Sequence, residues 1–158
     1  MCRLGLGLYG VDPRDCPALP LGSSKNRILS TVSTLKTTIL QMRHVAAGET
    51  VGYSRKGVID KDSVIAAIPI GYADGLNRHL GNRHCYCIVN GQKAEYVGNI
   101  CMDVAMIDVT GIDCHEGDQV EIFGEHLPVT VLSDVLDTIP YEVLTGVSNR
   151  VKRVYFQD

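Results

Sequence analysis

The chain has no tryptophan, only two phenylalanines, and no long apolar run among its 158 residues. Without the roughly 20 consecutive apolar residues that a membrane-spanning helix needs, no membrane partner is predicted. Runs of one charge are also missing, because 15 Lys and Arg are scattered among 18 Asp and Glu, so no nucleic-acid partner is expected. The six cysteines have no zinc-ligand spacing, and no metal site is predicted.

Two further absences concern the compartment. The sequence shows no signal peptide, and its cysteines do not form the pattern of a disulfide framework. Cys85 and Cys87 are two positions apart, so on a strand they would share one face. We therefore predict a cytoplasmic protein whose cysteines are reduced, small apolar residues.

Most of the sequence consists of short apolar runs that are separated by turn signals. These signals recur about every eight to twelve residues, which is typical of an antiparallel β-barrel or sandwich. Asn90-Gly91 is the strongest hairpin signal, because a type I′ turn needs positive φ at both central residues. The predicted fold is therefore mainly β with two short helices. Strands are predicted at 3–10, 32–45, 50–53, 64–70, 84–89, 93–97, 104–109, 119–123 and 151–156, and helices at 129–136 and 140–145.

The beginning of the chain differs in composition from the rest. It opens on an apparent strand with no lead-in, and residues 11–28 are rich in Pro, Gly and Ser, which interrupt helices and strands. We expect a piece of a longer protein, in which residues 1–28 end a preceding domain and form a linker. Residues 29–158 then form the β-domain.

The densest motif is the stretch from Ile68 to Arg78, which follows an apolar strand. Gly71 and Gly75 allow positive φ and close backbone approach. Asp74 is predicted to cap the turn through its carboxylate rather than to act in catalysis. Tyr72 would then stand at a strand end, where a binding loop can present its hydroxyl.

Four other segments accompany this motif in a fixed order: 52–55, 99–103, 138–142 and 149–153. Together the five segments resemble the C-terminal domain of alanine racemase, an enzyme that uses pyridoxal phosphate (PLP) to interconvert L- and D-alanine. The resemblance implies a mostly β domain behind a (β/α)₈ barrel, of which residues 1–28 would be the last strand and linker. It also implies a head-to-tail homodimer, in which the C-terminal domain of one subunit completes the active site of the other.

In this resemblance Tyr53 takes the place of the catalytic base that removes the α-proton of L-alanine. Racemisation needs acid/base groups on opposite faces of a planar carbon. A tyrosine has an ordinary pKa near 10, so cationic neighbours must lower it for this task. The alternative is a tyrosine half-buried at a strand end.

The cofactor roles fall on four residues. Arg3 matches an arginine that donates to the PLP pyridine nitrogen, and the backbone N–H groups of Gly5 and Leu6 match phosphate contacts. Tyr141 matches a tyrosine whose hydroxyl binds the same phosphate. The alternatives are an arginine at a strand start and an aromatic residue packed at the start of a helix.

The substrate roles fall on the segment at Met102 and Asp103, where the Met102 N–H would contact the alanine carboxylate from the partner subunit. Tyr72, Arg78 and Ile139 match residues that line the entrance, although Arg78 also fits a solvated loop charge. Arg150 and Arg153 match the closing motif of the family, in which proline is usual where this chain has Lys152.

The lysine that holds PLP in the family belongs to the barrel, and no lysine of this chain has a matching context. We therefore expect the chain alone to be inactive, and its parent to supply D-alanine for peptidoglycan. Three alternatives stay open: another PLP racemase such as one for serine, a non-catalytic β interaction domain, and a parent fused to a Mur-type cell-wall ligase. The amino-acid sequence that follows Tyr72 resembles that of those fused proteins.

Overall fold

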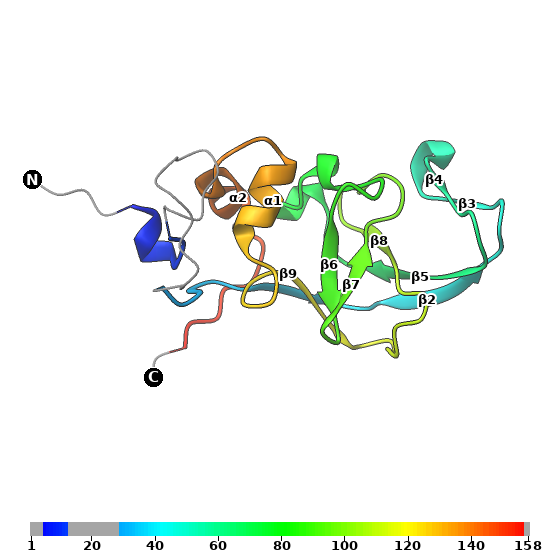
Figure 1. Ribbon diagram of the computed structural model, residues 1–158, viewed down its shortest axis with the longest axis horizontal. Helices are drawn as coiled ribbons and strands as arrows, with labels where there is room; N and C mark the ends of the chain where they lie inside the picture. The colour runs from blue at the N-terminus through cyan, green and yellow to red at the C-terminus, as the bar shows by residue number, and fades with distance from the viewer. Residues whose placement is uncertain (1–4, 13–28, 157–158) are drawn as a thin grey trace, which may run out of the picture.

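The computed structural model describes residues 5–12 and 29–156 (Figure 1). Nine strands and two α-helices occur in this part of the chain, together with short 3₁₀ helices. The strands are β1 (Leu35–Thr38), β2 (Gln41–Val45), β3 (Thr50–Val51), β4 (Gly57–Val58), β5 (Ser63–Ile68), β6 (Tyr86–Val89), β7 (Gln92–Glu95), β8 (Ala105–Asp108) and β9 (Gln119–Phe123). The helices are α1 (Val129–Val135), α2 (Pro140–Gly146), η1 (Leu6–Tyr9), η3 (Tyr53–Arg55), η4 (Tyr72–Asp74) and η5 (Arg78–Leu80).

The fold is mainly antiparallel β, as predicted, and its two larger sheets join into a barrel, whereas β3 and β4 form a separate two-stranded sheet. One sheet has the order β1-β9-β6-β7 and another has the order β2-β5-β8. A bridge between Tyr96 and Ile107 joins the β7 side of the first sheet to β8 of the second. At the other seam, the chain passes from β1 to β2 as Ile39 donates to Asp118 beside β9 and Leu40 donates to Ala67 on β5. A single bent segment therefore pairs with both sheets.

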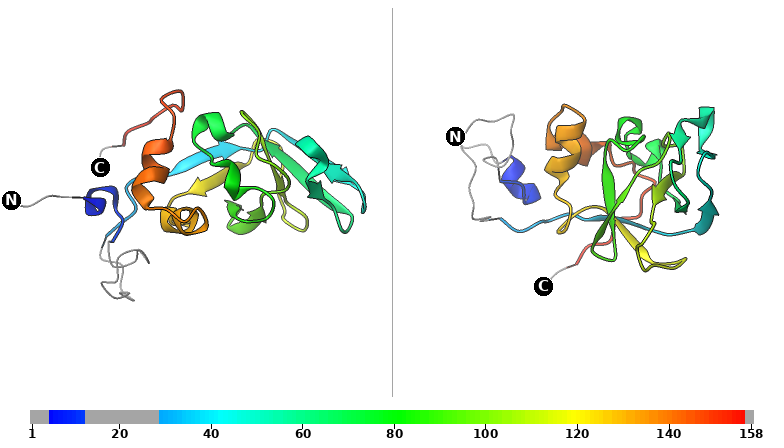
Figure 2. Two further views of the ribbon diagram at one scale, coloured as in Figure 1. Left: turned by 90° about the horizontal axis from the view of Figure 1, so that it is seen from above. Right: turned by 45° about the vertical axis from the view of Figure 1, so that its right-hand side comes forward.

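Local sequence explains several of these elements. The β6–β7 hairpin turns at Asn90-Gly91, whose φ values of 47° and 76° are the left-handed values that the turn requires. Pro140 stands at the first position of α2, where its missing N–H costs nothing. Both helices cover one end of the barrel (Figure 2), and Leu132 of α1 and Val143 of α2 are buried against its core.

Two predicted strands are wrong. Residues 3–10 are not a strand where they are described, since Leu6–Tyr9 is a 3₁₀ helix closed by Gly10 at φ 73°. Glycine is unfavourable in strands, and the local bond from the Leu8 N–H to the Gly5 carbonyl takes over. Residues 151–156 form no strand either. There the Arg153 guanidinium donates back to the carbonyls of Val147 and Ser148, and these bonds favour a turned segment.

Four cysteines are free, namely Cys85, Cys87, Cys101 and Cys114, while Cys2 and Cys16 lie outside the described residues. No group of three or more potential metal ligands occurs within residues 5–12 and 29–156. No helix of this part combines the length and the hydrophobicity that a membrane crossing requires.

The hydroxyl group of Tyr96 is a buried polar group in the core that lacks a hydrogen-bond partner among the described residues. Tyr96 is 1% exposed. Burial raises the pKa of Tyr96 well above its ordinary value, so the hydroxyl stays neutral. A buried hydroxyl without a partner loses its hydrogen bonds to water on folding, which opposes stability.

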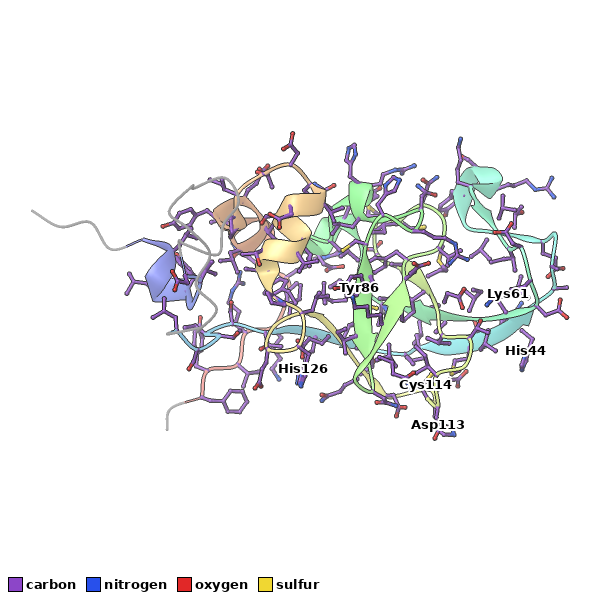
Figure 3. All side chains as sticks on the ribbon, in the orientation of Figure 1. His44, Lys61, Tyr86, Asp113, Cys114 and His126 are labelled. Carbon is purple, nitrogen blue, oxygen red and sulfur yellow. The ribbon has the colours of Figure 1, made fainter. Side chains whose placement is uncertain are left out.

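We therefore predict that Tyr96→Phe leaves the free energy of unfolding unchanged or raises it by about 1 kcal/mol, since the ring stays and only an unpaired hydroxyl leaves. Urea unfolding measures this difference. Tyr86→Phe is the matched control, because Tyr86 on β6 (labelled in Figure 3) is half-buried and its ring stays packed against the core when only the hydroxyl is removed. A clear loss of stability in Tyr96→Phe alone would mean that the hydroxyl has a partner.

Candidate functional site

The predicted catalytic residue, Tyr53, projects from the loop between β3 and β4. Its side chain is 73% exposed, which contradicts the alternative of a half-buried tyrosine. The backbone around it is unusual, with positive φ at Gly52 (78°), Ser54 (60°) and Arg55 (52°). Left-handed conformations are unfavourable for residues other than glycine, so neighbouring contacts must hold this loop in place.

Those contacts come from the segment that begins at Gly98. The Asn99 side-chain amide donates to the Tyr53 carbonyl oxygen at 3.1 Å, and Asn82 donates to the Asn99 side-chain oxygen at 3.1 Å. A Cβ on Gly57 would come within 2.9 Å of the Gly98 nitrogen, so only glycine allows this approach. Neither Asn82 nor Asn99 is among the site residues predicted from the sequence, although Asn99 opens the segment 99–103.

The predicted substrate segment, Met102 and Asp103, lies directly against the turn at 71–75, here called the Gly-Tyr turn. The Tyr72 N–H donates to the Cys101 carbonyl and the Ala73 N–H to the Met102 carbonyl, both at 3.0 Å. A Cβ on Gly71 would meet both carbonyl oxygens at 2.3 Å. No backbone carbonyl in the described part of the chain accepts from the Met102 N–H, and this residue is 53% exposed.

Charged groups join this pair of segments to the end of the chain. Arg150 donates to Asp74 at 2.6 Å and to Asp103 at 2.5 Å, so one guanidinium connects three segments. Asp74 also accepts from the Gly71 N–H at 2.9 Å, which confirms the predicted turn cap. The hydrogen bond from Arg150 lowers the pKa of the Asp74 carboxyl, and Arg150 itself has a raised pKa because of both carboxylates.

At the other end of the molecule the structure brings two predicted cofactor residues together. A Cβ on Gly5 would lie 2.5 Å from the Tyr141 hydroxyl oxygen, so a larger residue at this position would displace the phenol. The Tyr9 ring packs edge-on against the Tyr141 ring, with ring centres 5.9 Å apart. A phenol donor beside an unobstructed backbone fits a phosphate group. Arg3 lies outside the described residues.

These two groups of residues are far apart. Figures 1 and 2 show η1 and α2 at one end of the barrel, with β3, β4 and the intervening Tyr53 loop at the opposite end. The structure therefore does not bring Tyr53 together with Gly5 and Tyr141 within one chain. The segment with Met102 and Asp103 belongs to neither group and lies against the Gly-Tyr turn.

A cleft of about 420 Å³ opens beside the Gly-Tyr turn. Tyr72 and Arg78 both line it, as do Thr138 and Glu142 from the start of α2. Apolar residues of the core, including Phe123 and Leu132, form other parts of its wall. Ile139 does not line the cleft itself, but it adjoins Thr138 and is 48% exposed.

Comparison with known proteins gives one consistent result. The family model described as the alanine racemase C-terminal domain matches residues 32–155. Over 153 residues, the chain is 40% identical to an alanine racemase of Alteromonas mediterranea, a match that covers 96% of the chain and 41% of that relative. It is also 40% identical over 162 residues to alanine racemase 2 of Caldanaerobacter subterraneus, covering 98% of the chain and 39% of the relative. The chain thus spans about 40% of the length of these relatives.

Solved structures agree with the sequence comparison. An alanine racemase of Bartonella henselae with covalently bound pyridoxal phosphate superposes with a TM-score of 0.84 at 38% identity, over 96% of this chain and 40% of that one. The alanine racemase of D-cycloserine-producing Streptomyces lavendulae gives a TM-score of 0.86 at 30% identity, over 98% and 40%. The predicted fold class is confirmed by these matches.

The ion pairs of Arg150 predict a pH-dependent contribution to stability. Because the folded-state pKa of Asp74 is lowered, its contribution is present above the ordinary carboxyl pKa of about 3.9 and is lost as the pH falls through the lowered value. The stability difference between the wild type and Arg150→Gln should therefore be constant above about pH 5 and shrink below about pH 4. Urea unfolding at a series of pH values measures it.

Arg153→Gln is the matched control for this prediction. Among the described residues, the acceptors of the Arg153 guanidinium are the carbonyls of Val147 and Ser148, which do not titrate. Its effect on stability should not change across the same acidic range. An Arg150→Gln difference that persists unchanged at the lowest pH would contradict the role assigned to the Asp74 pair.

Proposed function

The chain belongs to the family of the alanine racemase C-terminal domain, and from this premise we propose that it completes the active site of a PLP-dependent racemase that interconverts L- and D-alanine. The whole enzyme would pair this domain with a PLP-binding barrel. One observation carries the proposal. Tyr53 is exposed on a tightly held loop, at the end of the molecule opposite the Gly5 and Tyr141 contact.

That separation supports an active site shared between two subunits. Tyr53 of one chain would reach the cofactor bound near Gly5 and Tyr141 of another, in a head-to-tail homodimer. Its phenol oxygen would take the α-proton from one face of L-alanine and return it in the reverse direction. A second base on the opposite face is required, and it would come from outside this chain.

The segment at Met102 and Asp103 would hold the substrate. The Met102 N–H has no backbone acceptor among the described residues, which leaves it free to donate to the alanine carboxylate. A backbone donor works with any side chain, so the position of this segment matters more than the identity of residue 102. The Asp103 pair with Arg150 and the two bonds from the Gly-Tyr turn hold that position.

Gly5, Leu6 and Tyr141 would bind the phosphate of PLP, and Arg3 would contact its pyridine nitrogen. When bound, PLP supplies the electron-withdrawing system that makes the α-proton of alanine removable. The Tyr141 hydroxyl and the unobstructed backbone at Gly5 suit a phosphate oxygen, as described above. Tyr72, Arg78 and Ile139 would border the path by which alanine enters. The enzyme would work in the cytoplasm and supply D-alanine for peptidoglycan.

Replacement of Tyr53 tests the central role. In the full-length racemase, Tyr53→Phe should lower the racemisation rate by roughly 10²- to 10⁴-fold, the usual contribution of a positioned base. Both directions must fall together, because the equilibrium between the enantiomers is unchanged. Solvent deuterium should enter L-alanine more slowly, whereas its entry into D-alanine should persist through the second base. Tyr86→Phe is the control, and wild-type rates in Tyr53→Phe would refute the assignment.

Subunit mixing tests whether Tyr53 acts across the dimer. A Tyr53→Phe enzyme is expected to keep only a small fraction of the wild-type activity, and an enzyme that lacks the PLP-binding lysine is expected to have none. Mixed dimers should recover activity, because one of their two sites combines an intact tyrosine with an intact lysine. If mixed dimers form and stay inactive, Tyr53 acts within its own chain or not at all, and a non-catalytic interaction domain becomes the better explanation.

We expect that the chain alone neither binds PLP covalently nor racemises alanine. After incubation with PLP and reduction with borohydride, mass spectrometry should find no lysine labelled in stoichiometric amount. The reason is that no lysine of the sequence lies in a context like that of the family's PLP-binding residue. A single lysine labelled to completion would contradict this.

A further inference from the structure

We propose that Asn99 is a positioning residue for the catalytic tyrosine, and that Asn82 fixes the orientation of its amide. This inference rests on the proposed role of Tyr53. Asn99 is 8% exposed, so its polar side chain is nearly removed from water. Both ends of its amide are used, the nitrogen toward the Tyr53 carbonyl and the oxygen toward Asn82.

The direction of this chain of hydrogen bonds is determined by its last member. The Tyr53 carbonyl can only accept, so the Asn99 group facing it must be the N–H donor. The Asn99 oxygen then faces Asn82, which must in turn present its own N–H. A flipped Asn99 amide would place two oxygens together at Tyr53, and Asn82 disfavours that flip because its donor would face another donor.

The Tyr53 loop needs such a constraint. Gly52, Ser54 and Arg55 have positive φ, and Ser54 and Arg55 adopt it despite their side chains. Of the side chains in the described part of the chain, only Asn99 donates a hydrogen bond to the Tyr53 carbonyl. Without that bond, the loop can relax toward ordinary backbone angles and move the phenol. Misplacement of a reacting group by about 1 Å can lower a rate a hundredfold.

Asn99 also connects the base to the substrate contact. It stands three residues before Met102, and its own carbonyl accepts from the Cys101 thiol at 3.6 Å. The bond from Asn99 to Tyr53 therefore ties the catalytic loop to the short segment that would hold the alanine carboxylate. The distance between base and substrate is then controlled by one rigid connection rather than by two independent loops.

Asn99→Asp is the sharpest test, because it keeps the size and the acceptor oxygen while removing the donor. In the purified 158-residue chain, hydrogen exchange followed by mass spectrometry should show about tenfold faster exchange in peptides covering residues 50–58. Peptides from β5 should be unchanged. Asn77→Asp is the matched control, because the Asn77 side chain accepts from the His79 N–H, and an aspartate does the same.

The second readout is activity in the full-length racemase that carries this domain. Asn99→Asp should lower kcat about 10- to 100-fold while KM for alanine changes less than about twofold, since the substrate contact at Met102 is retained. A merely structural role would instead reduce the amount of folded enzyme without changing its kcat. Wild-type kcat together with unchanged loop exchange in Asn99→Asp would overturn the proposal.

Asn82→Asp keeps the test decisive if Asn99→Asp fails to fold. Asn82 is exposed and has φ 54°, a conformation that aspartate tolerates, so the fold should survive while the donor to Asn99 is lost. Loop exchange should rise and kcat should fall, each less than in Asn99→Asp. No change in either would overturn the proposal. A wild-type rate in Tyr53→Phe refutes the catalytic role instead, and the exchange result still decides the Asn99 contact.

Discussion

The close backbone contacts of residues 98–103 are the constraint on which the candidate site depends. On one side Gly98 lies against Gly57 beneath the Tyr53 loop, and on the other the carbonyls of Cys101 and Met102 lie against Gly71. Neither contact leaves space for a Cβ. Because glycine occupies these positions, one short segment can touch both loops at once. The positions of the predicted base and of the predicted substrate segment are therefore coupled through a shared backbone.

Polar side chains reinforce this arrangement in two different ways. Asn99 acts where water is nearly excluded, and both ends of its neutral amide are hydrogen-bonded, so it avoids the cost of burying a charge. Arg150 acts at the surface, where its ion pairs to Asp74 and Asp103 are weakened by solvent but join segments distant in sequence. Salt should therefore weaken the Arg150 ion pairs more than the hydrogen bonds of Asn99.

The barrel gives these loops a stable base and also keeps two groups of residues apart. Gly5 and Tyr141 lie beside the helices at one end, and Tyr53 lies at the other, with a closed ring of strands between them. A closed barrel cannot fold over to bring its ends together. Residues that serve one reaction from such positions must meet through a second copy, which is the physical basis of the proposed shared site.

Local chemistry allowed much of this protein to be predicted from its sequence alone. The Asn90-Gly91 hairpin, the capped turn at Asp74 and the two helices follow from neighbouring residues, and the spaced motifs led to the family. Only the tertiary structure decided how the barrel closes and that Asn82, Asn99 and Tyr53 meet. These outcomes depend on partners that are 17 to 46 residues apart in the case of Asn99, and no local pattern encodes such pairings.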